Sequence, residues 1–304
     1  MNDYTAALES AALFDISDTG KVLVTGPDAA KFLHNITSND ILNLPVGGGC
    51  ETYFLDHRAK VLHRVHVART AAHDFLLTTD PGRGEALFKH LDKFLISEQV
   101  ELQDVTTQYA MFHLAGPTAK TLLDLPDLEE FQHLERDGLL ICRHDSLGVP
   151  GYDIVCKAIP DIEAVKGTPA TYETLRIEAG TPVYGKDFDD TRFVLELPRA
   201  ARGISYTKGC FPGQEPIVMS RDRAGFVNRT LLGVKFDGSE LPAAGMKLLK
   251  DGQEVGTTNS ATFSPRLNST LALAYVRRGF QEPGTELVDS QGRNVKVLGS
   301  PPVT

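Results

Sequence analysis

The chain has 304 residues, of which 41% are apolar and 23% are charged, a composition typical of globular proteins rather than disordered ones. Its 31 basic and 40 acidic side chains give a net charge of -9, which argues against a dedicated nucleic-acid binder. The four cysteines include no C-x-x-C pair, which excludes a disulfide scaffold and closely spaced cysteine metal sites, and no apolar run reaches the roughly 18 residues of a membrane span.

The N-terminal segment MNDYTAALES has the features of neither a signal peptide nor a transit peptide, so we predict a cytoplasmic protein. A strand at 21–25 is expected to run into Gly26-Pro27 and then a helix. The same pattern recurs at 109–114 and Gly116-Pro117, and the apolar residues that follow repeat at a spacing of 90. Two related α+β units are one explanation, and coincidence between two common helix starts is the other.

The rest of the chain divides into an α+β part and an all-β part. Strands are expected at 53–55, 61–68 and 75–78, and helices at 84–95 and 168–179, the last ended by Gly180. From residue 230 helical periodicity disappears, and short β-type runs predict a barrel, with strands at 231–236, 246–250, 271–276 and 294–298. We therefore place the domains at 1–228 and 229–304.

The segment 204–216 is the densest in residues that can carry chemistry. Residues 211–214 fit a type II turn, with Pro212 and Gly213 at its centre. Gly209, directly before Cys210, lets the backbone approach another group closely, and the nearby Lys208 would favour a thiolate at Cys210. Cys210 is therefore a candidate catalytic group, and the alternative is a tight structural loop with a buried thiol.

Positive charge gathers around this segment. Residues 199–229 hold six basic and two acidic side chains, a local excess of +4 in an acidic chain. Such a field suits a small polyanionic ligand, such as a carboxylate or phosphate tail. The alternative is a solvated basic surface.

Glu178 stands in the last turn of its predicted helix, where the helix dipole disfavours negative charge. Residues that contradict local preference are enriched at functional sites. The two carboxylate oxygens suit a ligand edge with adjacent N–H donors, such as a pterin or guanine ring. The alternative is a salt bridge to Arg176 or Arg192.

Two weaker patterns predict no site. Gly82-Arg-Gly84 lacks the third glycine of a dinucleotide-binding loop. His57, His63 and His66 are close in sequence, but His63 and His66 would point to opposite faces of a strand, so one shared ion is not expected. We predict no metal site.

Three segments carry a resemblance to a known family. Lys208-Gly-Cys-Phe-Pro-Gly-Gln-Glu215 resembles the K-G-C-[FY]-x-G-Q-E motif of YgfZ-type folate-binding proteins, which are relatives of the glycine-cleavage T-protein. Leu175-Arg-Ile-Glu-Ala-Gly180 with Tyr184-Gly185 is similar to the superfamily's L-R-x-E-x-G…Y-G segment, whose glutamate binds the pterin of tetrahydrofolate. Ser264-Pro265 with 271–275 resembles the C-terminal barrel motif.

The resemblance also shows departures from the T-protein. The stretch 52–67 aligns with a T-protein segment that ends in a pair of aspartates, one of them the catalytic acid, and here His63 and Arg64 occupy the pair. Arginine cannot give up its proton at neutral pH, so it cannot take that role. T-proteins also carry a basic residue where this chain has Gln214. These departures predict folate binding without aminomethyl transfer.

The resemblance implies a T-protein-like α+β fold, with two interleaved α+β subdomains and a C-terminal β-barrel around a central folate cavity. It also implies a tetrahydrofolate-binding protein that supports iron–sulfur cluster assembly or repair, and tRNA modification, with iron–sulfur proteins or assembly factors as partners. The alternatives are an aminomethyltransferase that uses another acid, and a ligand-free interaction module. The predicted folate contacts are Glu178, Tyr184, Lys208, Gln214 and Arg223.

Overall fold

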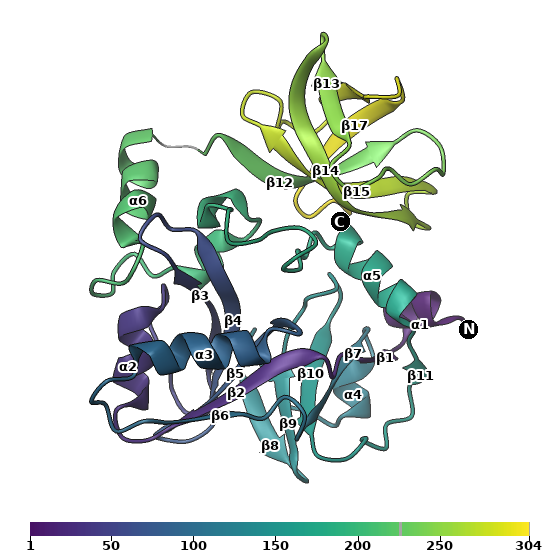
Figure 1. Ribbon diagram of the computed structural model, residues 1–304. Coiled ribbons are helices and arrows are strands. Elements are labelled where there is room, and N and C mark those ends of the chain that lie inside the picture. Colours follow the sequence, from purple (N-terminus) through teal and green to yellow (C-terminus); the bar gives the residue numbers. More distant parts are fainter. Residues whose placement is uncertain (225–226, 304) are drawn as a thin grey trace. The chain divides into compact units, whose positions relative to one another are not determined.

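The computed structural model describes residues 1–224 and 227–303, which form two compact units (Figure 1). The first unit contains Met1–Asp145, Val149–Thr168 and Ala201–Pro216, and the second contains Ser146–Gly148, Pro169–Ala200 and Ile217–Thr304. The domain boundary between 228 and 229 stays a prediction. Within the described part of the chain, no helix has both the length and the apolar character needed to cross a membrane.

The first unit contains two sheets built from interleaved segments of the chain. The five-stranded sheet has the order β3 (Gly49–Leu55), β4 (Val61–Arg69), β5 (Asp74–Pro81), β2 (Thr19–Thr25) and β6 (Glu101–Asp104). The six-stranded sheet has the order β11 (Val165–Lys166), β1 (Ala12–Asp15), β7 (Ala110–Ala115), β10 (Gly151–Cys156), β9 (Leu139–Arg143) and β8 (His133–Arg136). Because β1 lies in one sheet and the next five strands lie in the other, the two subdomains are interleaved, as predicted.

A strand, a glycine and a helix repeat in the two subdomains. Strand β2 leads through Gly26 (φ +119°) into α2 (Ala29–Ile36), and β7 leads through Gly116 (φ +135°) into α4 (Ala119–Leu122). A Cβ atom at either glycine would lie 2.3 Å from a carbonyl oxygen of a neighbouring segment. Both positions therefore require glycine for the same steric reason, and the predicted recurrence is confirmed.

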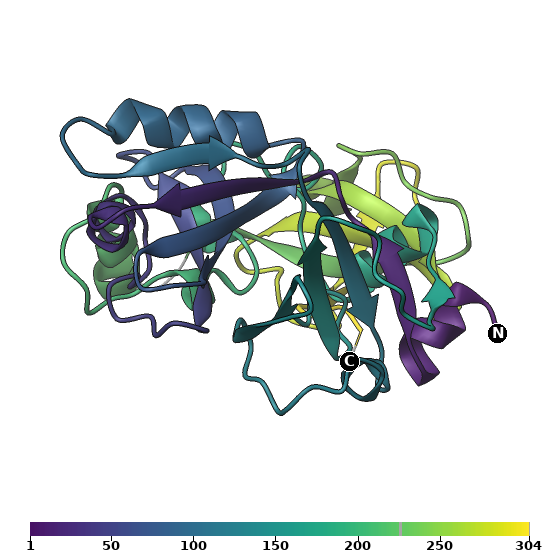
Figure 2. The same ribbon diagram turned by 90° about the horizontal axis from the view of Figure 1, so that it is seen from below.

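Helices α2 and α3 (Gly84–Phe94) cover one face of the five-stranded sheet, as Figure 2 shows for α3. Leu87 and Leu91 of α3 are buried, and they pack with Val65 and Val67 of β4. One face of β4 is thus committed to an apolar core. Arg64 and His66 lie on the opposite face, whereas His63 shares the packed face and lies beside His90 of α3.

The second unit holds α5 (Pro169–Glu178) and a closed barrel, which confirms the predicted barrel. The barrel order is β12 (Arg229–Phe236), β15 (Ser269–Arg277), β14 (Gln253–Ser264), β13 (Lys247–Lys250), β16 (Glu286–Asp289) and β17 (Asn294–Gly299). Gly180 (φ +74°) ends α5 in the left-handed conformation, as predicted. The remaining elements are α1 (Asp3–Glu9), η1 (Val194–Glu196), η2 (Ala200–Gly203), α6 (Gln214–Met219) and η3 (Ser220–Ala224).

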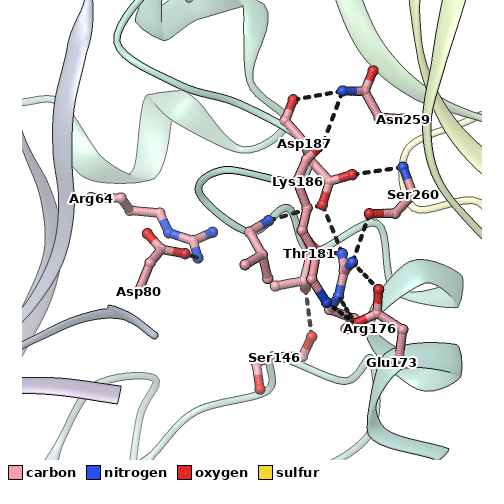
Figure 3. A network of polar contacts seen from close by, with 11 residues as sticks. Arg64, Asp80, Ser146, Glu173, Arg176, Thr181, Lys186, Asp187, Asn259 and Ser260 are labelled. Carbon is pink, nitrogen blue, oxygen red and sulfur yellow. Dashed lines mark hydrogen bonds and ion pairs between the residues drawn. The ribbon is translucent and has the colours of Figure 1, made fainter. Parts of the chain in front are cut away.

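A buried guanidinium ties α5 to the barrel (Figure 3). Arg176 is 1% exposed, and all five of its N–H donors have acceptors. It donates to both oxygens of Glu173, to Oδ2 of Asp187 at 2.8 Å, to the carbonyl of Thr181 at 3.0 Å and to Oγ of Ser260 on β14 at 2.7 Å. One side chain therefore fixes the helix, the loop after it and a barrel strand together.

Replacing Arg176 with Met is expected to lower the free energy of unfolding by about 3–5 kcal/mol, because the buried Asp187 carboxylate loses its charged partner. Urea unfolding followed by circular dichroism measures this loss. Arg277→Met, at an exposed position of β15, is the matched control and should change the stability by less than about 0.5 kcal/mol. Equal stability of the two variants would contradict the importance of the network.

Candidate functional site

Glu178, the last residue of α5, is 0% exposed and is held by the barrel. The hydroxyl of Ser264 donates to Oε1 at 2.5 Å, and Nε of Arg266 donates to Oε2 at 3.0 Å. Two segments that carried the resemblance, 175–180 and 264–265, therefore meet at one carboxylate. The salt bridge from Glu178 to Arg176, one alternative from the sequence, is wrong, because the guanidinium of Arg176 donates to Glu173 and Asp187 instead. Arg266 was missed, since only the tertiary fold brings it near.

Tyr184 lies in the loop that follows α5. Its ring meets the ring of Phe188 edge-on, with 5.5 Å between centroids, and the two residues also form an isolated backbone bridge. The buried Asp187 anchors this loop, because its Oδ2 accepts from the backbone N–H of Val183 at 3.0 Å. Tyr184 and Glu178 thus both belong to the second unit.

Lys208 serves as a cap for α2. Its ammonium donates to the carbonyl of His34, to that of Thr37 at 2.6 Å and to that of Asn39 at 3.0 Å. The carbonyls of His34 and Thr37 lie at the C-terminal end of the helix, where backbone acceptors lack intrahelical partners, and that of Asn39 lies just beyond it. Burial lowers the pKa of Lys208 to about 8, although the carboxylate of Asp40 opposes this shift. This capping role was not predicted from the sequence.

The predicted turn after Lys208 is confirmed. The N–H of Gln214 donates to the carbonyl of Phe211 at 3.2 Å, and Gly213 has φ +80°. A Cβ atom at Gly213 would lie 2.6 Å from the carbonyl oxygen of Asp56, so the turn packs closely on the β3–β4 connection. Gln214 is the first residue of α6. Cys210 is exposed, so the alternative of a buried thiol is wrong.

Several basic side chains of the 199–229 segment have acidic partners within the chain. Arg202 donates to Glu130 at 2.8 Å, and Arg229 donates to Glu196 at 3.1 Å. Arg221 pairs with its neighbour, Asp222. The side chain of Arg223, a predicted folate contact, lies outside the described residues. Part of the local positive charge is therefore already neutralised by these pairs.

His63 and His66 lie on opposite faces of β4, as predicted. The His63 ring packs 5.2 Å from the ring of His90 on α3, and burial, together with the charges of His90 and Arg83, lowers the pKa of His63 to about 3. The His66 ring lies on the other side of the sheet, 4.4 Å from the ring of His144. His63 is therefore a neutral packing residue.

Arg64 pairs with a carboxylate on the adjacent strand, as the left part of Figure 3 shows. Its Nη2 lies 2.7 Å from Oδ1 of Asp80, and the Asp80 side chain is 2% exposed. The antiparallel register of β4 and β5 pairs Val65 with Thr79, which brings Asp80 beside Arg64. A buried carboxylate thus stands next to the position where the T-protein pattern places an aspartate. Sequence reasoning missed it, because only strand pairing joins the two residues.

Comparison with protein families finds the GCVT N-terminal domain at residues 1–135 and the glycine cleavage T-protein C-terminal barrel domain at residues 229–303. The chain thus carries both domains of the T-protein superfamily. The T-protein-like fold predicted from the resemblance is confirmed.

Proteins named aminomethyltransferase are similar to this T-protein-superfamily chain over almost its whole length. The one from Clostridium botulinum (strain Loch Maree / Type A3) is 28% identical, over 98% of this chain and 85% of the relative. The one from Lysinibacillus sphaericus is 27% identical, over 98% of this chain and 87% of the relative. The crystal structure of glycine cleavage system aminomethyltransferase T from Bartonella henselae superposes with a TM-score of 0.85, at 24% identity, over 99% of this chain and 88% of that one.

These relatives correct the functional prediction. The resemblance to YgfZ-type proteins predicted support of iron–sulfur enzymes, and that prediction is wrong, because the full-length relatives are named aminomethyltransferases. They favour the alternative that the sequence had ranked second. Iron–sulfur partners and tRNA modification have no support in these comparisons.

Proposed function

We propose that this chain is a tetrahydrofolate-dependent aminomethyltransferase of the glycine cleavage type. The observation that carries the proposal is Glu178: a carboxylate with no exposed surface, at the junction of the two segments that resemble the superfamily's folate-binding and barrel motifs. A charge buried at the end of a helix, against the dipole, is costly and is kept where function uses it. The resemblance gives this glutamate the pterin ring as its ligand.

The partners of Glu178 support a pterin as its ligand. Ser264 and Arg266 donate one to each carboxylate oxygen, and Arg266 is the more accessible of the two, with its side chain 27% exposed. Adjacent N–H groups on a pterin edge present donors of the same kind to the same two oxygens. Ligand binding would then exchange one donor for another, without leaving the buried charge unpaired.

The proposal assigns the proton-handling role of the missing aspartate pair to Asp80. This carboxylate is buried on β5, and the Arg64 guanidinium fixes its orientation at 2.7 Å. Arg64 cannot donate a proton itself, but it can position a neighbouring carboxylate that exchanges one with the substrate. The folate roles of Tyr184, Lys208 and Gln214 and a chemical role of Cys210 stay predictions.

Glu178→Gln is expected to weaken tetrahydrofolate binding by about 1–3 kcal/mol, because one charged acceptor opposite the ring donors is lost. Calorimetric titration measures this, starting from a parent dissociation constant in the micromolar range, about -8 kcal/mol. Glu286→Gln, an exposed position on β16, is the matched control and should bind like the parent. Equal affinity of all three proteins would remove Glu178 from the site, and no binding by the parent would point to an interaction module.

Asp80→Asn is expected to lower kcat for release of methylenetetrahydrofolate from an aminomethylated lipoyl carrier by about 10²–10⁴-fold, since a positioned acid–base group contributes this much. Tetrahydrofolate affinity should change little, which separates a catalytic effect from misfolding. Asp74→Asn, at the other end of β5, serves as the control and should retain the parent rate. Parent-like turnover by Asp80→Asn would exclude Asp80, and no turnover by the parent would overturn the proposed activity.

A further inference from the structure

A small cavity of about 30 Å³ lies between the two sheets of the first unit. Strands β4 and β5 of one sheet and β7, β9 and β10 of the other contribute its walls. Apolar side chains such as Leu76, Met111 and Val155 form part of the lining, and these three pack in one core cluster. Polar side chains that face into such a cavity require a partner, because desolvation without one is unfavourable.

Three of the lining residues are metal-ligating types that converge. His66 from β4, His144 immediately after β9, and Asp153 from β10 each present one ligand atom, and the three atoms lie within 4.8 Å of one another. The side chains are 23%, 13% and 9% exposed, respectively. Two imidazoles and one carboxylate are a donor set that divalent transition metals use, whereas Ca²⁺ and Mg²⁺ prefer oxygen donors alone.

Hydrogen bonds between two of these residues, and polar contacts with their neighbours, orient the side chains. Asp153 accepts at both oxygens, from Nδ1 of His113 at 2.7 Å and from Nδ1 of His144 at 2.8 Å. Nε2 of His66 lies 3.5 Å from a carboxylate oxygen of Glu51, whose other oxygen accepts from the hydroxyl of Tyr53 at 2.6 Å. Metal sites in proteins commonly hold their ligands through such hydrogen-bonded carboxylates and imidazoles.

We propose that His66, His144 and Asp153 bind one divalent transition-metal ion of the Zn²⁺ type in this cavity. The ion would link β4 of the five-stranded sheet to β9 and β10 of the six-stranded sheet, and so connect the two interleaved subdomains. The proposal is independent of the folate chemistry, because none of the three ligands belongs to the proposed pterin or proton-transfer residues. The histidine pair His63 and His66 had been rejected as a site, and that rejection holds, because the second imidazole comes from His144, 78 residues further along the chain.

The test uses Co²⁺ as a spectroscopic probe on the purified full-length chain after treatment with a chelator. One equivalent of Co²⁺ should produce visible d–d bands, and Zn²⁺ should remove them by displacement. Zn²⁺ at about 100 times its dissociation constant should also raise Tm by about 5 °C. An intense charge-transfer band is not expected, because Cys142, which also lines the cavity, is not among the three ligands.

His66→Gln and His144→Gln should each abolish the bands and the Tm shift, and the two variants together guard against one of them failing to fold. His63→Gln, on the same strand but the opposite face, is the matched control and should bind Co²⁺ like the parent. Absence of d–d bands in the parent would overturn the proposal and leave the cluster as a hydrogen-bonded histidine–aspartate network. Parent-like spectra of both His66→Gln and His144→Gln would overturn it too, because the ion would then bind elsewhere.

Discussion

The guanidinium of Arg176 is the constraint on which the second unit depends. A buried charge of this kind is stable only when every donor has an acceptor, and Arg176 meets this condition through a helix neighbour, the loop that follows the helix and a barrel strand. Its position is therefore fixed from three directions. Two residues later the helix ends at Glu178, so the network also determines where that carboxylate lies. The costly placement of Glu178 becomes possible because Arg176 fixes the helix end beside the barrel residues that donate to it.

The same logic applies to the polar face of the five-stranded sheet. One face of β4 packs against α2 and α3, so Arg64 and His66 are left on the other, where each finds a partner from a different strand. Arg64 meets Asp80 on β5, and His66 meets His144 beyond β9. The alternation of side chains along β4 therefore places packing residues on one face and Arg64 and His66 on the other. Neighbouring segments of the chain supply the partners of these two side chains.

The fold and many of the local elements could be predicted from the sequence, because helical and strand periodicity, the two Gly-Pro turns and the resemblance all agree, but strands such as β10 and β14 were not predicted. The turn at 211–214 was equally predictable, because Pro212 and Gly213 stand at the two central positions where a type II turn favours these residue types. Arg266, Asp80 and His144 could not be assigned, because each becomes relevant only through a tertiary contact with a residue far away in the chain. The functional prediction relied on His63 and Arg64 in place of the aspartate pair, and the sequence did not reveal that the carboxylate of Asp80 lies beside Arg64 on the next strand.

In the proposed function, Glu178 recognises the pterin of tetrahydrofolate. A crystal structure of the chain with bound tetrahydrofolate would show whether it does. The expected result is a pterin ring edge whose adjacent N–H groups donate to both carboxylate oxygens of Glu178, with Arg266 displaced from Oε2. A pterin ring bound away from Glu178, with the Arg266 contact intact, would contradict the claim.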